Sequence, residues 1–294
     1  MASIDFMADL QEIIRRELSN LGHPPKPEED LETLLIRHLN LVRRIPPVIS
    51  WNIKKSKELI SKSLSEEIRN GLQQFIEKAE SGQDLKPHIS HRINNPDYKD
   101  LMFYDWEFFH FHLGTTLDPN PRRSGFIQGT NELLFAILAS DSEMMYLIDI
   151  HPHGSFTNQD LLRIIEENWG ELLDPYTVPG IYEIDHNPSD NDIGSFRKAR
   201  LVTMLQTPGG RILSPMGGGM MTDGSSVKNV IEADEIRANV REIQEIFIQQ
   251  RETLTTLFKS KYNKDWDDLN FKLISFEQPE KIKELTTGTV WKIS

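Results

Sequence analysis

The 294-residue sequence contains no cysteine. Disulfide bridges, zinc sites with thiolate ligands and a cysteine nucleophile are therefore excluded. The chain also lacks an apolar run of about 18 residues, the length that suggests a transmembrane helix. It has no N-terminal cationic segment followed by an apolar one, which a secretory signal would need. These absences predict a soluble, cytoplasmic protein with no membrane partner.

Positive charge is scarce, and the formal net charge is −12. Residues 101–200 hold 6 Lys and Arg against 16 Asp and Glu, a balance of −10, together with five of the nine histidines. A nucleic-acid-binding surface is expected to be locally basic, so this third of the chain is not predicted to be a general phosphate platform. Its composition suits a bound cation, and the plainer alternative, which composition alone favours, is a solvated acidic surface.

The first part of the chain has helical periodicity. Apolar residues recur at helical spacing over 4–21, and a second helix is predicted over 29–44, before Pro46 and Pro47. A third stripe runs from Ile60 to Phe75 and ends before Gly82. Near the other end, the stripe formed by Ile236, Val240, Ile243 and Phe247 predicts a long amphipathic helix.

After residue 100 the period changes to that of strands. The segments 131–139 and 144–151 predict an antiparallel hairpin around a polar turn, and residues 107–113 alternate as another strand. Thr157 is a candidate N-cap for a helix to Trp169. Further strands are predicted over 201–206, 211–214, 271–276 and 289–293.

This order predicts an α+β fold, with N-terminal helices followed by an antiparallel sheet with appended helices. The expected organisation is a helical region over 1–95 and an α+β domain over 96–294, or one compact unit containing both, because no flexible linker divides the chain.

Two His-x-His pairs stand in predicted strands, in FFHFHLG at 108–114 and YLIDIHPHGSF at 146–156. Residues two apart in a strand face the same way, so the members of each pair project together, and an aspartate shares the second face. We expect the two pairs to form one site if their strands are neighbours. The candidate site consists of His110, His112, Asp149, His151 and His153.

Two kinds of chemistry suit this set. Imidazoles and a carboxylate on one patch are ligands for a divalent metal such as zinc, manganese or iron. Histidine also serves as general acid and base near neutral pH. The plainer alternative is that some of these residues are ordinary surface or hydrogen-bonded histidines.

A glycine-rich segment, PMGGGMMTDGSS at 215–226, precedes the long helix. Consecutive amides ahead of a helix N-terminus form a natural anion site, and a basic cluster lies upstream. The alternative is a plain connection with tight turns. The candidate phosphate-binding residues are Gly217, Gly218, Gly219, Ser225 and Ser226, with Arg197, Lys198 and Arg200.

Residues 122–154 carry two resemblances. The order RRSG, NELLFAIL, MMYLIDIHPHG resembles the sheet of RelE/ParE-type bacterial toxins, which are endoribonucleases and gyrase poisons. That resemblance implies that Arg123, with His151 or His153, faces the substrate. IDIHPHG also resembles the first metal-binding strand of amidohydrolases, but the 141 residues of 154–294 are too few for that family's barrel and hold one histidine.

The leading functional hypothesis is a hydrolase that cleaves a phosphodiester in RNA or a nucleotide, in a bacterial toxin or phage-defence system. One alternative is a non-catalytic assembly or regulatory protein of such a system, which binds a protein partner through its N-terminal helices. The other is a metal-dependent hydrolase of a non-phosphate substrate.

Overall fold

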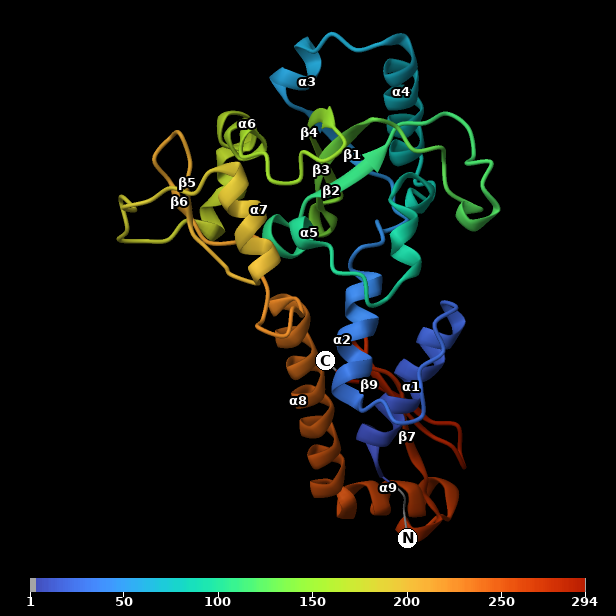
Figure 1. Cartoon of the computed structure of the whole chain (residues 1–294). Helices are drawn as coiled ribbons and strands as arrows, with labels where there is room; N and C mark the ends of the chain where they lie inside the picture. Colours follow the sequence, from blue (N-terminus) through green and yellow to red (C-terminus); the bar gives the residue numbers. More distant parts are fainter. Residues whose placement is uncertain (1–3, 294) are drawn as a thin grey trace. The chain divides into compact units, whose positions relative to one another are not determined.

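The computed structural model describes residues 4–293 (Figure 1). These residues form two compact units. The first unit contains the chain up to Asn40 and from Asn229 onward, and the second contains Leu41–Lys228. The boundary expected near residue 95 lies inside the second unit, just before helix α5. The predicted α+β class is confirmed, including the long C-terminal helix.

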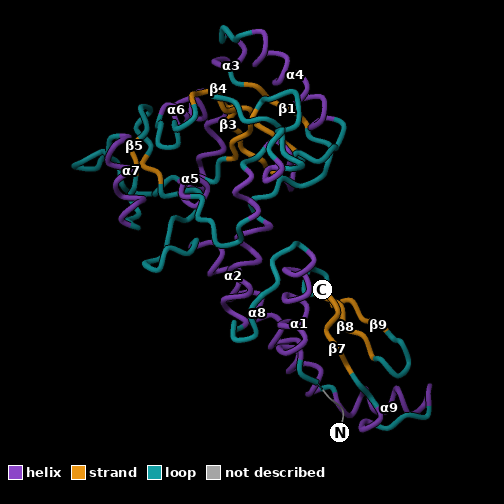
Figure 2. Tube along the Cα trace, turned by 45° about the vertical axis from the view of Figure 1, so that its right-hand side comes forward, coloured by secondary structure: helices purple, strands orange, loops and turns teal. Residues whose placement is uncertain are grey.

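The first unit combines helices with an antiparallel three-stranded sheet of order β7-β8-β9 (Figure 2). The predicted helices over 4–21 and 29–44 and the amphipathic C-terminal helix are present, whereas β8, which alternates Glu and Lys with a buried isoleucine, was not predicted. The elements are α1 (Phe6–Asn20), α2 (Leu31–Val42), α8 (Val227–Gln249), α9 (Arg251–Tyr262), β7 (Phe271–Ser275), β8 (Glu280–Glu284) and β9 (Val290–Ile293).

A buried carboxylate joins α1 to β7. Asp9 is 3% exposed, and its two oxygens accept from the Lys272 ammonium at 2.5 Å and the Leu273 amide at 3.0 Å. Burial raises the pKa of Asp9, opposed by these contacts. The apolar face of α1, with Phe6, Leu10 and Ile14, packs in the same core as β7. Helix α1 is thus fixed by packing and by one polar anchor.

The second unit is built on a four-stranded sheet of order β1-β4-β3-β2. The predicted hairpin is confirmed as β3 and β4, and β2 pairs antiparallel with β3. Strand β1 lies in the part of the sequence expected to be helical, and it pairs parallel with β4, which makes the sheet mixed. The strands are β1 (Asn52–Lys55), β2 (Phe109–His112), β3 (Glu132–Ala139) and β4 (Met144–Pro152).

Helices cover both faces of this sheet, α4 on one side and α6 on the other (Figure 1). Phe109 and Phe111 of β2 pack with Phe75 of α4. On the opposite face, Phe135 of β3 shares a core with Ile165 of α6. The predicted alternation of β2 is therefore correct, and it leaves His110 and His112 on the α6 side.

The remaining elements differ from expectation mainly at their ends. The stripe predicted as one helix from Ile60 is divided, because Ser65 caps a new helix by accepting from the Ile68 amide at 3.3 Å. The helix expected to start after Thr157 begins at Asp160. The elements are α3 (Lys57–Ser61), α4 (Glu66–Glu80), α5 (Leu101–Trp106), α6 (Asp160–Trp169), α7 (Asp190–Ala199), β5 (Leu205–Gln206) and β6 (Ile212–Leu213).

Candidate functional site

A β-bulge between β3 and β4 determines which way the end of β4 faces. Phe135 pairs with Asp149, but the next residue of β3, Ala136, pairs with Leu147, so β4 carries one extra residue. Phe135 also pairs with His110 of β2. Because paired residues project from the same face of a sheet, the bulge places Asp149 on the face of His110 rather than on that of Leu147.

A second set of paired residues runs across strands β2, β3 and β4 in the same way. His112 pairs with Leu133, and Leu133 pairs with His151. All the strand histidines therefore project from one face, but β3 lies between the two strands that carry them, so these strands are not neighbours. Strands two positions apart are separated by roughly 10 Å. His112 and His151 are therefore not directly opposed.

His153 reaches the first pair instead. Its ring centroid lies 6.1 Å from that of His112, with the planes 21° apart. The chain bends beyond β4, where the His153 amide donates to the Asn131 carbonyl at 2.6 Å. Phe156 lies 5.1 Å from His110 and 5.5 Å from His153, ring to ring. His110, His112 and His153, here called the histidine cluster, thus gather around Phe156.

Two members of the histidine cluster are held neutral. Burial lowers the pKa of His112 to about 4, with further lowering by His110 and His153 nearby. His112 Nδ1 accepts from the Thr130 amide at 3.0 Å, which leaves the proton of the neutral ring on Nε2. Burial also lowers the pKa of His110, whose Nδ1 is enclosed without a hydrogen-bond partner among residues 4–293.

Asp149 and His151 form a separate group. The Asp149 carboxylate is bound by Lys62 at 2.7 Å, and His151 Nε2 lies 3.0 Å away, close enough for an ion pair although not aligned as a hydrogen bond. Burial acts to raise the pKa of Asp149, but the contacts of His151 and Lys62 outweigh it, so the pKa is lowered. Asn158 contacts His151 Nδ1 at 3.3 Å. Each ring nitrogen of His151 therefore has a polar neighbour within 3.3 Å.

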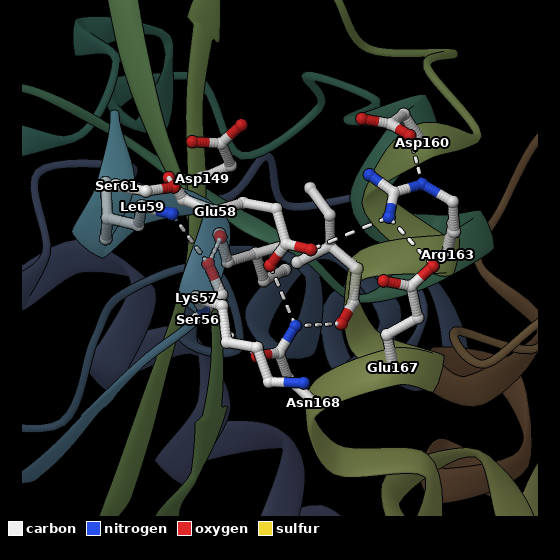
Figure 3. Close-up of polar contacts among 12 residues, drawn as sticks. Ser56, Lys57, Glu58, Leu59, Ser61, Asp149, Asp160, Arg163, Glu167 and Asn168 are labelled. Carbon is white, nitrogen blue, oxygen red and sulfur yellow. Dashed lines mark hydrogen bonds and ion pairs between the residues drawn. The ribbon is translucent and has the colours of Figure 1, made fainter. Parts of the chain in front are cut away.

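This group borders a polar network that joins α3 to α6 (Figure 3). Glu58 accepts from Asn168 at 2.8 Å and lies 3.5 Å from Arg163, which also contacts Asp160 at 2.6 Å. Figure 3 also labels Asp149 and draws no contact between it and these residues. The contacts are within and between two packed helices, so we interpret the network as structural.

The histidine cluster lines a cleft of about 1040 Å³ within the second unit. One face of α7 contributes residues at helical spacing, and the segment from Ser90 to Met102 forms another wall. The lining holds five cationic side chains and two carboxylates, a difference of +3, in addition to four imidazoles. The charged groups are Arg92, Lys99, Arg123, Arg197 and Lys198, with Asp100 and Asp190.

The four arginine and lysine residues that the sequence indicated as site residues lie in different environments. Lys198 lines the cleft and is exposed, and Arg123 lines it while pairing with Asp118 at 3.2 Å. Arg200 instead donates to the Thr222 carbonyl at 2.7 Å. Arg197 is 4% exposed, and its Nε contacts Asp105 at 2.9 Å. The structure therefore brings three of the four predicted arginine and lysine residues to the histidine cluster.

The glycine-rich segment uses its amides inside the fold. Gly217 donates to the Asp105 carbonyl at 2.9 Å, and Gly219 to the Tyr104 carbonyl at 2.8 Å. Gly218 donates to Pro215, and Ser225 donates to Asp223 through both its amide and its hydroxyl. Ser226 is buried and forms a bridge with Met220. The segment lines no part of the cleft.

His88 is a neighbour of the cluster that the sequence did not indicate. Its Nδ1 contacts the His112 carbonyl at 2.9 Å, and its Nε2 contacts the Lys78 ammonium at 3.1 Å. Burial lowers the pKa of His88 to about 4, and Lys78 adds to the effect. Arg92 and Lys99 of the cleft were also missed, because neither stands in a recognisable motif.

Within residues 4–293, no group of three or more His, Asp or Glu side chains is arranged to hold a metal ion. No helix in this part of the chain is long and apolar enough to cross a membrane. Comparisons with protein families, curated proteins and solved structures found no match. The cleft itself is therefore the feature that bears on function.

Proposed function

We propose that the cleft of the second unit binds a phosphodiester of RNA or of a nucleotide and hydrolyses it. The observation that supports this proposal is the concentration of charge: five cations and the histidine cluster line one cleft, in a part of the chain that is otherwise acidic. Cations complement the negative phosphate and stabilise the charge that develops in the transition state.

His153 is the proposed proton-transferring residue. It is exposed, and its ring makes no hydrogen bond to any described residue. In the reaction its ring takes a proton from the attacking water molecule as the new P–O bond forms. The imidazolium then returns that proton to the leaving oxygen as the old P–O bond breaks, so the step is balanced.

His112 has a different proposed role. Since Thr130 occupies its Nδ1, the neutral ring offers only an N–H at Nε2. A neutral imidazole of this kind donates a hydrogen bond to a phosphate oxygen rather than accepting a proton. Lys198 and Arg123 supply positive charge from the cleft walls.

The resemblance to RelE/ParE-type toxins supports the same residues in part. Arg123 and His153, two of the residues that it assigns to the substrate side, line the cleft, whereas His151 does not. A role in a toxin or phage-defence system rests on this resemblance alone. A bound zinc, manganese or iron ion is a separate prediction, tested by the metal content of the purified protein, and the proposed chemistry uses none.

The test is turnover of an RNA oligomer and of bis(p-nitrophenyl) phosphate. His153→Ala is expected to lower kcat by about 100-fold or more, the usual contribution of a general acid–base. His112→Ala should also lose activity, and the double variant should lose little more, because residues that act as a unit are not additive. His186→Ala is the control, since His186 is exposed and outside the cleft.

Unchanged turnover in His153→Ala would contradict the assigned role. Absence of turnover in the unaltered protein, with tight RNA binding, would instead favour the non-catalytic alternative.

A further inference from the structure

We infer that Arg197 and His110 form a buried subsite that binds the terminal phosphate of a nucleotide or of an oligonucleotide end. This inference rests on the proposed function and narrows its substrate class, because it selects a ligand with a phosphate monoester. It concerns a second phosphate, not the one that is cleaved.

Arg197 carries an unused donor in an enclosed place. Its Nε contacts Asp105, its Nη1 donates to the Phe156 carbonyl, and its guanidinium lies 4.3 Å from the Trp106 ring. Nη2 is buried and has no partner among residues 4–293, although the residue lines the cleft. Buried donors in folded proteins almost always have a partner, so this atom calls for a ligand or a water molecule.

His110 adds a second polar atom of the same kind. Its Nδ1 is enclosed and unpartnered, and its ring packs against Phe156, whose carbonyl binds Arg197. The two unsatisfied nitrogens therefore belong to residues that both contact Phe156 and line the same cleft. A phosphate has several acceptor oxygens and can accept from both nitrogens, with an N–H on each.

The burial of Arg197 decides which part of a ligand can reach it. An internal phosphodiester carries a nucleoside on both sides, and a side chain that is 4% exposed offers no room for two substituents. A terminal phosphate has one substituent, so it fits as the end of a ligand that extends toward the histidine cluster.

Three carboxylates oppose this assignment. Asp105 contacts Arg197, and Asp190 also acts on Arg197. The charge of Asp100 acts on both Arg197 and His110. However, the Asp100 carboxylate accepts from the Phe103 amide at 3.1 Å as the N-cap of α5. Lys99 and Lys198 of the same cleft provide compensating positive charge.

Calorimetric titration with AMP, adenosine and inorganic phosphate tests the subsite. None of these ligands has a diester to hydrolyse, so the outcome does not depend on catalysis. We expect AMP to bind at least about tenfold more tightly than adenosine. Arg197→Lys keeps a cation beside Asp105 but lacks Nη2, and it should remove most of that difference. Arg163→Lys, outside the cleft, is the matched control.

Equal affinities for AMP and adenosine, or a ratio unchanged in folded Arg197→Lys, would overturn the inference. Binding of inorganic phosphate without AMP would overturn the terminal-nucleotide assignment. If Arg197→Lys does not fold, His110→Phe provides the second measurement and is expected to reduce the AMP-to-adenosine ratio. Loss of turnover in His153→Ala with this ratio retained would separate the two proposals.

Discussion

At the scale of single residues, the hydrogen bonds of a buried histidine fix its protonation state. His88 lies 1% exposed between the Lys78 ammonium and the His112 carbonyl. Lysine can only donate, so it donates to His88 Nε2, and Nδ1–H then donates to the carbonyl. This arrangement fixes the neutral form, because a proton on Nε2 would remove the acceptor and place two positive charges side by side.

This arrangement makes the stability of the protein depend on pH. The pKa of His88 is about 4 in the fold, against an ordinary 6.5, so between these values the unfolded chain binds a proton that the folded chain does not. The associated stability is present above pH 6.5 and is lost as the pH falls toward 4. The difference corresponds to about 3 kcal/mol.

Urea unfolding at several pH values between 7 and 4 measures this loss. His88→Asn removes the titrating group while keeping a donor for the His112 carbonyl. The variant is expected to be less stable at pH 7 and to lose less stability on acidification. Parallel curves for the two proteins would show that His88 does not contribute to the pH dependence. His112, with its pKa lowered in the same direction, accounts for part of the remaining slope.

At the scale of elements, the bulge in β4 determines which face of the sheet carries the side chains at the end of this strand. In a regular strand, Asp149 would lie on the face of Leu147, which packs toward α4, because residues two apart share a face. Strand β4 then ends, and the following turn carries His153 back to His112. The site is therefore assembled by an irregularity and a turn, not by two adjacent regular strands.

The glycine-rich segment provides a prediction about the packing of α5. A Cβ atom at Gly217 would lie 2.5 Å from the Phe103 carbonyl oxygen and closer still to that of Tyr104. Both are backbone atoms and cannot move aside. We expect Gly217→Ala to destabilise the second unit by about 2 kcal/mol or more in thermal or urea unfolding.

Gly194→Ala is the comparison, because its Cβ would meet only a Thr157 methyl at 3.6 Å, within helix α7. It should be neutral or slightly stabilising, since alanine favours helix over glycine by about 1 kcal/mol. Equal stability of the two variants would mean that α5 and the glycine segment move apart without cost.

At the scale of the whole molecule, the net charge of the chain and the charge of the cleft lining have opposite signs. The net charge is −12, yet the cleft lining has an excess of cations. Residues 101–200 contain only six Lys and Arg, and Arg123, Arg197 and Lys198 all line the same cleft. Composition averages over a surface, whereas a ligand experiences the field of the groups around it.

The division into two units predicts that the cleft is self-contained. All of its lining residues lie between Ser90 and Lys198, inside the unit Leu41–Lys228, which has its own apolar cores. We expect a protein consisting of residues 41–228 to fold cooperatively and to bind AMP with the affinity of the full chain. Circular dichroism melting and calorimetry measure these properties. A soluble fragment with no melting transition would show that the second unit depends on the first.

The sequence by itself determined the features that depend on residues close together in the chain. Periodicity placed α1, α2, α8 and the β3–β4 hairpin, because a helix or a strand with one apolar face must bury that face. It also placed His110 and His112 on one face of β2, since alternation in a strand is local. The α+β class follows from these elements.

Tertiary structure decided the rest. Strand β1 has four residues and exists through pairing with β4, a partner about ninety positions away, which local propensity cannot reveal. Strand β3 lies between β2 and β4 and so separates Asp149 and His151 from His110 and His112, and the chain beyond β4 brought His153 to that pair. Arg92 and Lys99 meet Arg197 at the cleft only because the segment from Ser90 to Met102 and helix α7, which are distant in sequence, line the same cleft. Local patterns specify which way a side chain points within its own element, and packing between elements determines which side chains meet.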